Sequence, residues 1–263
     1  MHNELQRNKP IEIPTQAEIE DKLRREDLNI WLELWRAEQG PAKPGALKLI
    51  AATIPFPTGQ SLRVLDVCCG TGDAGRAIHS RFPQAQIDFV DRNLFFVSLC
   101  GAVNRRDGIS GRTLVRDLSE PDWRRDLASD YDVVVTVNAM QWFSLARAAQ
   151  LFGDIFNSLR AGGAFLLMEP AAAESQFASG FNAWQKEQPS QHKHEDWQRF
   201  WSRVNALVGS DYGFLGSPPD GQNQIGDGLS VMQWVGLLTD AGFESIDILL
   251  RDPEKVVLAG VKP

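Results

Sequence analysis

The feature that most constrains the fold is a ten-residue segment, Val64 to Asp73, which reads Val-Leu-Asp-Val-Cys-Cys-Gly-Thr-Gly-Asp. A short apolar run ends in an acid and passes through a glycine loop into a helical stretch. Glycines let backbone N–H groups approach a ligand that a side chain would hold off. A buried strand that leads through such a loop into a helix is a nucleotide-site arrangement, so the segment predicts a bound ligand.

The charges of the loop favour one kind of ligand. Gly70 to Gly75 formally matches the dinucleotide pattern G-x-G-x-x-G. However, Asp66 ends the strand and Asp73 begins the helix. Each carboxylate would repel a diphosphate by on the order of 1–4 kcal/mol at a protein-like dielectric. S-adenosylmethionine, which carries a positive ammonium and a positive sulfonium, suits this loop better.

The segment from Val64 to Gly72 resembles the glycine-rich motif of class I S-adenosylmethionine-dependent methyltransferases, with Cys68 in place of the motif's first glycine. The resemblance covers roughly residues 62–170. It implies a doubly wound α/β fold: a mostly parallel, seven-stranded, Rossmann-like sheet with a terminal antiparallel strand and an added helical lid. It also implies S-adenosylmethionine as cofactor and S-adenosylhomocysteine as product.

Acids at the next two predicted strand ends agree with this resemblance. A strand over Gln86 to Val90 ends at Asp91, about twenty residues after the loop, where an acid can take both ribose hydroxyls. The strand from Thr113 to Arg116 ends at Asp117-Leu118, which the resemblance assigns to the adenine ring. Such an acid is alone more often a helix cap. Several strand ends of the expected type together favour the cofactor.

The fourth predicted strand is the β-branched run Tyr131 to Val137, and Asn138 follows it where the family contacts the methionine end of the cofactor. A fifth strand is predicted over Ala164 to Glu169. The predicted cofactor-binding residues are Asp66, Cys68, Gly70, Gly72, Asp91, Arg92, Asp117, Leu118 and Asn138.

A chain of 263 residues is most simply one domain with an elaboration. We predict a loose N-terminus (1–15), an N-terminal helical cap (16–60), a cofactor-binding core (61–170), a helical lid (171–229) and a C-terminal helix with two strands that completes the core (230–263). The cap is predicted as one helix from Thr15 to about Glu38 and a second from Ala46 to Thr53. The last part is predicted as a helix over Val231 to Ala241 and an antiparallel strand pair.

Cysteine usage and charge indicate a compartment and exclude some partners. Two of the three cysteines, Cys68 and Cys69, are adjacent and do not readily pair with each other, which indicates a reducing, cytoplasmic environment. No apolar segment is long enough to span a membrane. The net charge of −7 disfavours a nucleic-acid partner. We therefore expect a small-molecule methyl acceptor, while the oligomeric state stays open.

Aromatic residues of the cap and lid are candidates for contact with the acceptor. Most tryptophans at helical spacing are core residues. In the family, however, an N-terminal helix and an insertion after the fifth strand form a lid over the acceptor. The predicted substrate-binding residues are Trp35, Trp142, Trp184, Trp197 and Tyr212.

The catalytic residues remain unassigned. Methyl transfer from a sulfonium is an in-line displacement that needs alignment and exclusion of water rather than a covalent nucleophile. If a base takes part, His192, His194 and Glu169 are candidates, but the histidines lie in a very polar stretch and Glu169 could instead cap the next segment. His79 is expected to face solvent. No metal site is predicted, because the i, i+2 spacing of His192 and His194 suits no helix face.

Three functions remain open at this stage. The first is methylation of a small apolar or aromatic molecule at oxygen, nitrogen or carbon. The second is a protein of the same fold that binds S-adenosylmethionine without methylating. The third is an NAD-dependent oxidoreductase. An RNA or protein methyltransferase is disfavoured because Arg105-Arg106 and Arg124-Arg125 are isolated basic pairs.

Overall fold

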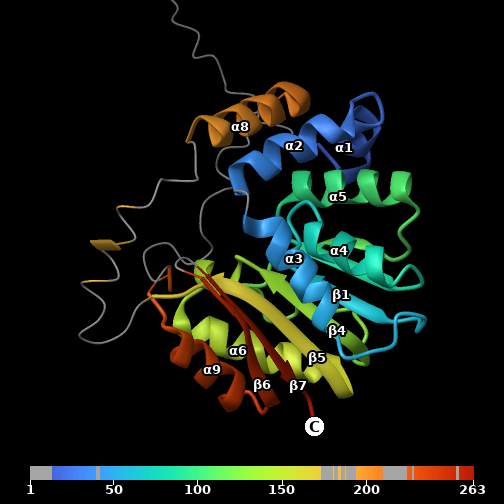
Figure 1. Cartoon of the computed structure of the whole chain (residues 1–263). Helices are drawn as coiled ribbons and strands as arrows, with labels where there is room; N and C mark the ends of the chain where they lie inside the picture. Colours follow the sequence, from blue (N-terminus) through green and yellow to red (C-terminus); the bar gives the residue numbers. More distant parts are fainter. Residues whose placement is uncertain are drawn as a thin grey trace, which may run out of the picture.

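The protein folds around one mixed β-sheet with helices on both faces and a further helical layer beyond (Figure 1). The computed structural model describes residues 14–39, 42–172, 180, 183–184, 187, 194–209, 224–226, 228–252 and 255–263. The elements are α1 (Gln16–Leu23), α2 (Leu28–Gln39), α3 (Ala42–Thr53), β1 (Arg63–Val67), α4 (Asp73–Arg81), β2 (Gln86–Asp91), α5 (Leu94–Asp107), β3 (Thr113–Val115), β4 (Tyr131–Val137), η1 (Met140–Trp142), α6 (Leu145–Ser158), β5 (Leu159–Pro170), α8 (His194–Val208), α9 (Val231–Asp240), β6 (Glu244–Arg251) and β7 (Lys255–Val261).

The sheet has seven strands in the order β3-β2-β1-β4-β5-β7-β6. Strands β1 to β5 pair in parallel, whereas β7 lies antiparallel between β5 and β6. This confirms the predicted mostly parallel, seven-stranded sheet with an antiparallel strand at its end. The strand order reverses between β1 and β4, and in open α/β sheets ligands bind beyond the carboxyl ends of the strands at such a reversal.

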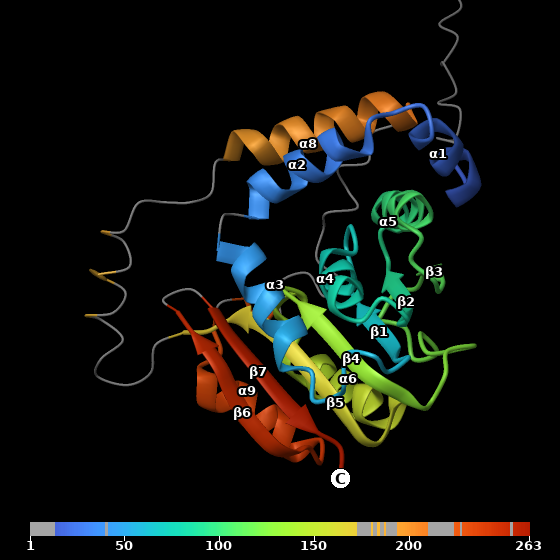
Figure 2. The same ribbon diagram turned by 45° about the vertical axis from the view of Figure 1, so that its right-hand side comes forward.

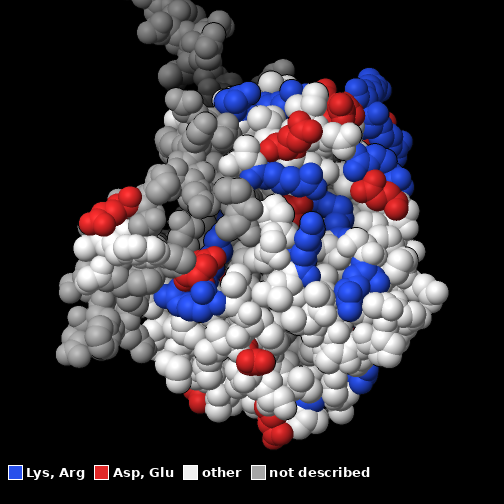
Figure 3. All heavy atoms as spheres, viewed as in Figure 1, with Lys and Arg blue, Asp and Glu red and all other residues white. Residues whose placement is uncertain are grey.

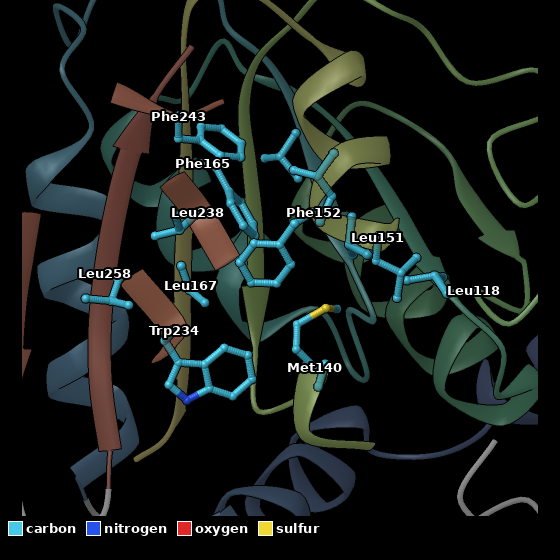
Figure 4. Packing of buried hydrophobic residues seen from close by; sticks show 14 of the residues in the cluster. Leu118, Met140, Leu151, Phe152, Phe165, Leu167, Trp234, Leu238, Phe243 and Leu258 are labelled. Carbon is cyan, nitrogen blue, oxygen red and sulfur yellow. The ribbon is translucent and has the colours of Figure 1, made fainter. Parts of the chain in front are cut away.

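Apolar side chains cover both faces of the sheet. On one face, α6 and α9 pack over the central strands, and Phe152, Phe165 and Trp234 lie at the centre of that cluster (Figure 4). On the other face, α3 and α4 pack through residues such as Ile50 and Ile78. The strands between them read as continuous apolar runs because they are buried on both faces.

The helical layer consists of α1, α2 and α8 together with α5, and α2 and α8 lie side by side (Figure 2). Six rings from α2, α5 and α8 contact one another and form what we call the aromatic cluster: Trp31, Trp35, Phe95, Phe96, Phe200 and Trp201. Helices from three distant parts of the sequence are therefore joined by direct aromatic contact.

Two predicted boundaries in the cap are wrong. The single helix predicted from Thr15 to about Glu38 is interrupted between α1 and α2, where the Asp27 carboxylate accepts the backbone N–H of Asn29 at 2.9 Å. Such local hydrogen bonds compete with helix continuation. The second helix begins at Ala42 rather than Ala46, because Pro44 falls in the first turn, where its missing N–H costs no helical hydrogen bond.

The fifth strand is longer than predicted, since β5 begins at Leu159 rather than Ala164. Its first residue pairs with Tyr131 across a bulge that precedes the regular pairing of Val133 with Ala164. An irregular register of this kind leaves no period-two pattern in the sequence.

The segment after β5 is only partly described. Most of the predicted lid, including the helix predicted around Phe177 and most of the loop over residues 209–228, lies outside the described residues. Its two ends meet, because Ala172 donates its N–H to the carbonyl of Leu229 at 2.8 Å and forms a bridge with Ser230. Over the described part of the chain, no helix combines the length and the apolar character that a membrane crossing requires.

Candidate cofactor site

Two strained residues mark the point where the strand order reverses. Cys68 directly follows β1 with a φ of 54°, and Asn138 directly follows β4 with a φ of 53°. Residues other than glycine seldom adopt positive φ, and such strain concentrates at functional sites. Glycine would carry no steric penalty at the position of Cys68.

Backbone hydrogen bonds hold the glycine loop against the neighbouring strand. The N–H of Cys69 donates to the carbonyl of Val90 at 3.0 Å, and the N–H of Gly70 donates to Oδ2 of Asp91 at 2.9 Å. Gly72 has a φ of 86°, and a Cβ there would lie 2.6 Å from Sγ of Cys100 on α5. The loop therefore has no room for a larger residue at Gly72.

The two acids that flank the loop are already engaged. Asp66 is buried, and its Oδ2 accepts the N–H of Gly75 in the first turn of α4 at 2.8 Å. Asp73 forms an ion pair of 2.6 Å with Arg76, and both side chains are about nine-tenths buried. Arg76 thus compensates the charge of Asp73, and its i, i+3 spacing from Asp73 is visible in the sequence. Asp73 therefore repels a diphosphate less than the sequence alone predicts.

Asp91 joins the end of β2 to the loop. Its side chain is buried and accepts the N–H of Asn93 at 2.8 Å as well as that of Gly70. Burial raises the pKa of the Asp91 carboxyl above its usual range, while these two hydrogen bonds and the charge of Arg92 oppose the rise. A carboxylate has about four acceptor positions, so Asp91 keeps capacity for ligand hydroxyls. Arg92 is half-buried beside it.

The end of β3 lies next to Asp91, because the N–H of Arg116 donates to the carbonyl of Asp91 at 2.9 Å. Asp117 accepts the N–H of Ser119 at 2.8 Å. The carbonyl of Leu118 accepts the Nε–H of Arg147 on α6 at 2.8 Å, a contact that sequence reasoning did not anticipate. The structure thus brings Asp117 and Leu118 to the same sheet edge as Asp91 and the loop.

Glu169 near the end of β5 is fully buried and faces the turn that follows β4. It accepts the backbone N–H groups of Ala139, Met140 and Gln141 at 2.9, 2.9 and 3.3 Å. Burial raises the pKa of Glu169 to about 7, against the lowering effect of these donors. The predicted cap of the next segment is wrong as to its partner, because both oxygens of Glu169 accept from the earlier turn after β4 rather than from the residues that follow β5.

The predicted substrate-binding aromatics divide into three groups. Trp35 is nearly buried, and its Cζ2 lies 3.9 Å from the position of a Cβ on Gly70. Trp142, on the turn after Asn138, is 46% exposed, and Trp184 is also exposed. The side chain of Trp197 on α8 and all of Tyr212 lie outside the described residues. Among the described rings, Trp35 and Trp142 therefore border the strand ends.

The expectation that His79 faces solvent is met only in part. Its side chain is half-buried, and its Nδ1 is buried without a hydrogen-bond partner. His192 and the side chain of His194 lie outside the described residues. Within the described ranges, no group of three or more His, Cys, Asp or Glu residues is arranged to hold a metal ion.

Charged side chains of both signs are interspersed on the face shown in Figure 3, mainly in its upper part over the helical layer. Basic groups of the helical layer are paired with acids, as in the contacts of Arg105 with Glu20 and of Arg203 with Glu26.

Comparisons with known proteins agree with the fold and the loop. A family model described as "Methyltransferase domain" matches residues 64–163. The malonyl-[acyl-carrier protein] O-methyltransferase of Bacillus anthracis is 25% identical over 150 residues, which are 56% of this chain and 52% of that protein. The chain thus spans about half the length of this curated relative.

Solved structures of low sequence identity share the fold. A candidate O-methyltransferase from Nostoc punctiforme has a TM-score of 0.55 and 17% identity, covering 94% of this chain and 69% of that one. Human N-acetylserotonin methyltransferase, solved in complex with S-adenosylmethionine, has a TM-score of 0.51 and 12% identity, covering 94% of this chain and 56% of that one.

Proposed function

We propose that this protein, whose residues 64–163 form a class I S-adenosylmethionine-dependent methyltransferase domain, transfers the methyl group of that cofactor to a small molecule. The observation that carries the proposal is the hydrogen bond from the N–H of Gly70 to Asp91. It joins the glycine loop to the acid at the end of β2, at the reversal of strand order where this fold binds ligands.

The residues at the sheet edge fit the parts of the cofactor. Asp91 would hold the ribose hydroxyls with its remaining acceptor positions. Asp117 and Leu118 would flank the adenine, since the hydrogen bond from Arg116 places that segment beside Asp91. The loop from Cys68 to Gly72 and the turn at Asn138 would enclose the methionine end.

When bound, the cofactor supplies an electrophilic methyl group on a positively charged sulfur. The chain's own contribution is alignment of the acceptor and exclusion of water. Trp35 stands over Gly70, and Trp142 projects from the turn beside Asn138. Both provide apolar surface next to the strand ends.

We propose an apolar or aromatic acceptor, methylated at oxygen, nitrogen or carbon. The support is the chemistry of the rings around the site and the interspersed charges of the surface in Figure 3, which suit an uncharged small molecule better than a polyanion. The names of the relatives support only the oxygen among these atoms: the Nostoc punctiforme protein is described as a candidate O-methyltransferase, and the Bacillus anthracis protein as an O-methyltransferase of a carrier-bound malonyl group.

Calorimetric titration with S-adenosylmethionine tests the proposal, with Asp91→Ala run beside the wild-type protein. Asp130→Ala is the matched control, because Asp130 is an exposed acid paired with Arg63 just before β4, at the opposite end of the sheet. We expect micromolar binding by the wild type and the control, and at least a tenfold loss in Asp91→Ala, about 1.4 kcal/mol.

The other outcomes identify the alternatives. No heat from the wild type at two temperatures would overturn the proposal, and binding of NAD instead would indicate an oxidoreductase. Binding without methyl transfer to any member of a panel of phenols, quinones and fatty acids would indicate a protein that binds the cofactor without methylating.

A further inference from the structure

We propose that Glu169 is a positioning residue, which holds the turn after β4 and through it couples the cofactor site to the returning end of the segment between β5 and α9. The proposal deepens the function proposed above and rests on it for the identity of the ligand. Glu169 is not one of the residues proposed above to contact the cofactor or the acceptor.

The first observation is the fit between the carboxylate and its donors. Both oxygens of Glu169 are buried, and together they accept three consecutive N–H groups, those of Ala139, Met140 and Gln141. A carboxylate accepts at both oxygens, whereas an amide accepts at one and would direct an N–H₂ group at these donors. A buried charge is costly unless its hydrogen bonds are made, so the arrangement is tightly specified.

The second observation is that this turn also forms one wall of the candidate site. Asn138 begins it at a φ of 53°, with its N–H donated to the carbonyl of Met168 at 2.7 Å. Met140 is fully buried and points into the core beneath the sheet (Figure 4). Trp142 projects outward at the end of the same turn. Glu169 therefore fixes a turn that carries both a predicted cofactor residue and a predicted substrate residue.

The third observation connects the turn to the far end of the predicted lid. The N–H of Gly226 donates to the carbonyl of Gln141 at 2.9 Å, and the N–H of Ile225 donates to that of Phe143 at 2.9 Å. Gln141 is thus bonded to Glu169 through its N–H and to Gly226 through its carbonyl. Any shift of the turn is transmitted to the chain that returns from the lid.

The protonation of Glu169 makes its role measurable through the pH dependence of the cofactor affinity. The ionised carboxylate accepts all three donors, whereas a protonated one directs an O–H at the same N–H groups. The Cys68 thiol after β1 interacts with the charges of Glu169, Asp66 and Asp91. Lys255 on β7 pairs with Pro170 in the sheet, and Nη2 of Arg251 on β6 donates to the carbonyl of Ala171. Burial, more than the nearby acids, raises the pKa of the Cys68 thiol well above its ordinary value, so the thiol is neutral near pH 7.

The test compares Glu169→Gln and Glu169→Asp with the wild type, in hydrogen exchange over residues 139–141 and in calorimetric affinity for S-adenosylmethionine between pH 6 and 8. In Glu169→Gln we expect these amides to exchange at least tenfold faster and the affinity to fall about tenfold. The wild-type affinity rises as the pH passes about 7, and this dependence is absent from Glu169→Gln. Glu169→Asp, which keeps the charge, recovers part of the affinity and the pH dependence.

Asp132→Asn is the matched control. Asp132 is likewise a buried carboxylate, bonded to the N–H of Arg63 at 2.8 Å and to Arg160 at 2.7 Å, but at the opposite end of β4. It should lower stability without changing exchange at residues 139–141 or cofactor affinity.

Two results would overturn the proposal: unchanged exchange at residues 139–141 in folded Glu169→Gln, or an equal loss of affinity in Asp132→Asn. If Glu169→Gln does not fold, Glu169→Asp decides: its shorter side chain should still loosen the turn, and exchange at residues 139–141 equal to that of the wild type would overturn the proposal as well. A wild type that binds no S-adenosylmethionine contradicts the proposed function, whereas the exchange measurement still decides the role of Glu169 in the turn.

Discussion

The Cζ2 edge of the Trp35 indole lies 3.9 Å from the point where a Cβ on Gly70 would stand, so a side chain of α2 faces the glycine loop at the position of a missing side chain. The same ring packs on Phe96 of α5 and Phe200 of α8, with centroids 4.7 and 5.3 Å away. The helical layer therefore approaches the cofactor loop through Trp35 of α2 as well as through Cys100 of α5.

Trp35→Phe should weaken binding of S-adenosylmethionine several-fold, because the smaller ring leaves the loop less covered. Trp31→Phe is the matched control, since Trp31 lies one turn earlier on α2 and packs on Phe95 and Phe200. Both variants should lose about 1 kcal/mol of unfolding free energy. Calorimetry and urea denaturation separate the two effects, and equal affinities in the two variants would contradict this role of Trp35.

Trp142→Ala should raise the KM for the acceptor while leaving the cofactor affinity unchanged. The ring is 46% exposed on the turn, so its removal should change the unfolding free energy by no more than about 0.5 kcal/mol. Met232→Ala, which truncates an exposed residue on α9, serves as the control for loss of surface apolar area. Steady-state kinetics with both substrates varied is the measurement, and an unchanged acceptor KM would rule out contact with Trp142.

Gly75→Ala should destabilise the protein by about 1–3 kcal/mol, because a Cβ there would lie 2.3 Å from Cε1 of Phe89. Gly153→Ala should do the opposite. Gly153 lies inside α6 with open space around it, and alanine is favoured over glycine in a helix by about 0.5–1 kcal/mol. Urea unfolding of both variants is the measurement, and equal signs would contradict the packing described here.

Glu169 should make the stability depend on pH. Its folded-state pKa of about 7 lies above the ordinary value of 4.5, so its contribution is complete below pH 4.5 and is lost as the pH rises to about 7. The loss should be on the order of 1–3 kcal/mol. Urea unfolding at pH 5 and pH 7.5 measures it, and Glu169→Gln should show a smaller difference between the two pH values than the wild type.

The sheet could be predicted from the sequence because its signals are local. The β-branched run before Asn138 and the glycines after Asp66 each determine their own conformation within a few residues. The common location of Asp91 and Asp117 could be predicted because the carboxyl ends of parallel strands lie on the same side of a sheet.

The contacts that organise the site could not be predicted, because each joins residues far apart in the chain. Trp35 meets Gly70, and Glu169 meets Ala139, with no pattern in either segment that indicates the partner. The break between α1 and α2 was missed for a different reason. The apolar spacing of Leu28, Trp31 and Trp35 is helical throughout, while the capping by Asp27 depends on one side chain.

The meeting of Ala172 with Leu229 and Ser230 has a consequence for how such a protein can change. The chain leaves β5 and arrives at α9 at neighbouring points, so a short loop could close the gap without moving α9 or the last two strands. The stretch between Ala172 and Leu229 could therefore be replaced as a unit. That stretch includes α8, which packs on α2 through the aromatic cluster. A replacement taken from another protein would therefore keep this packing only if α2 were replaced together with α8.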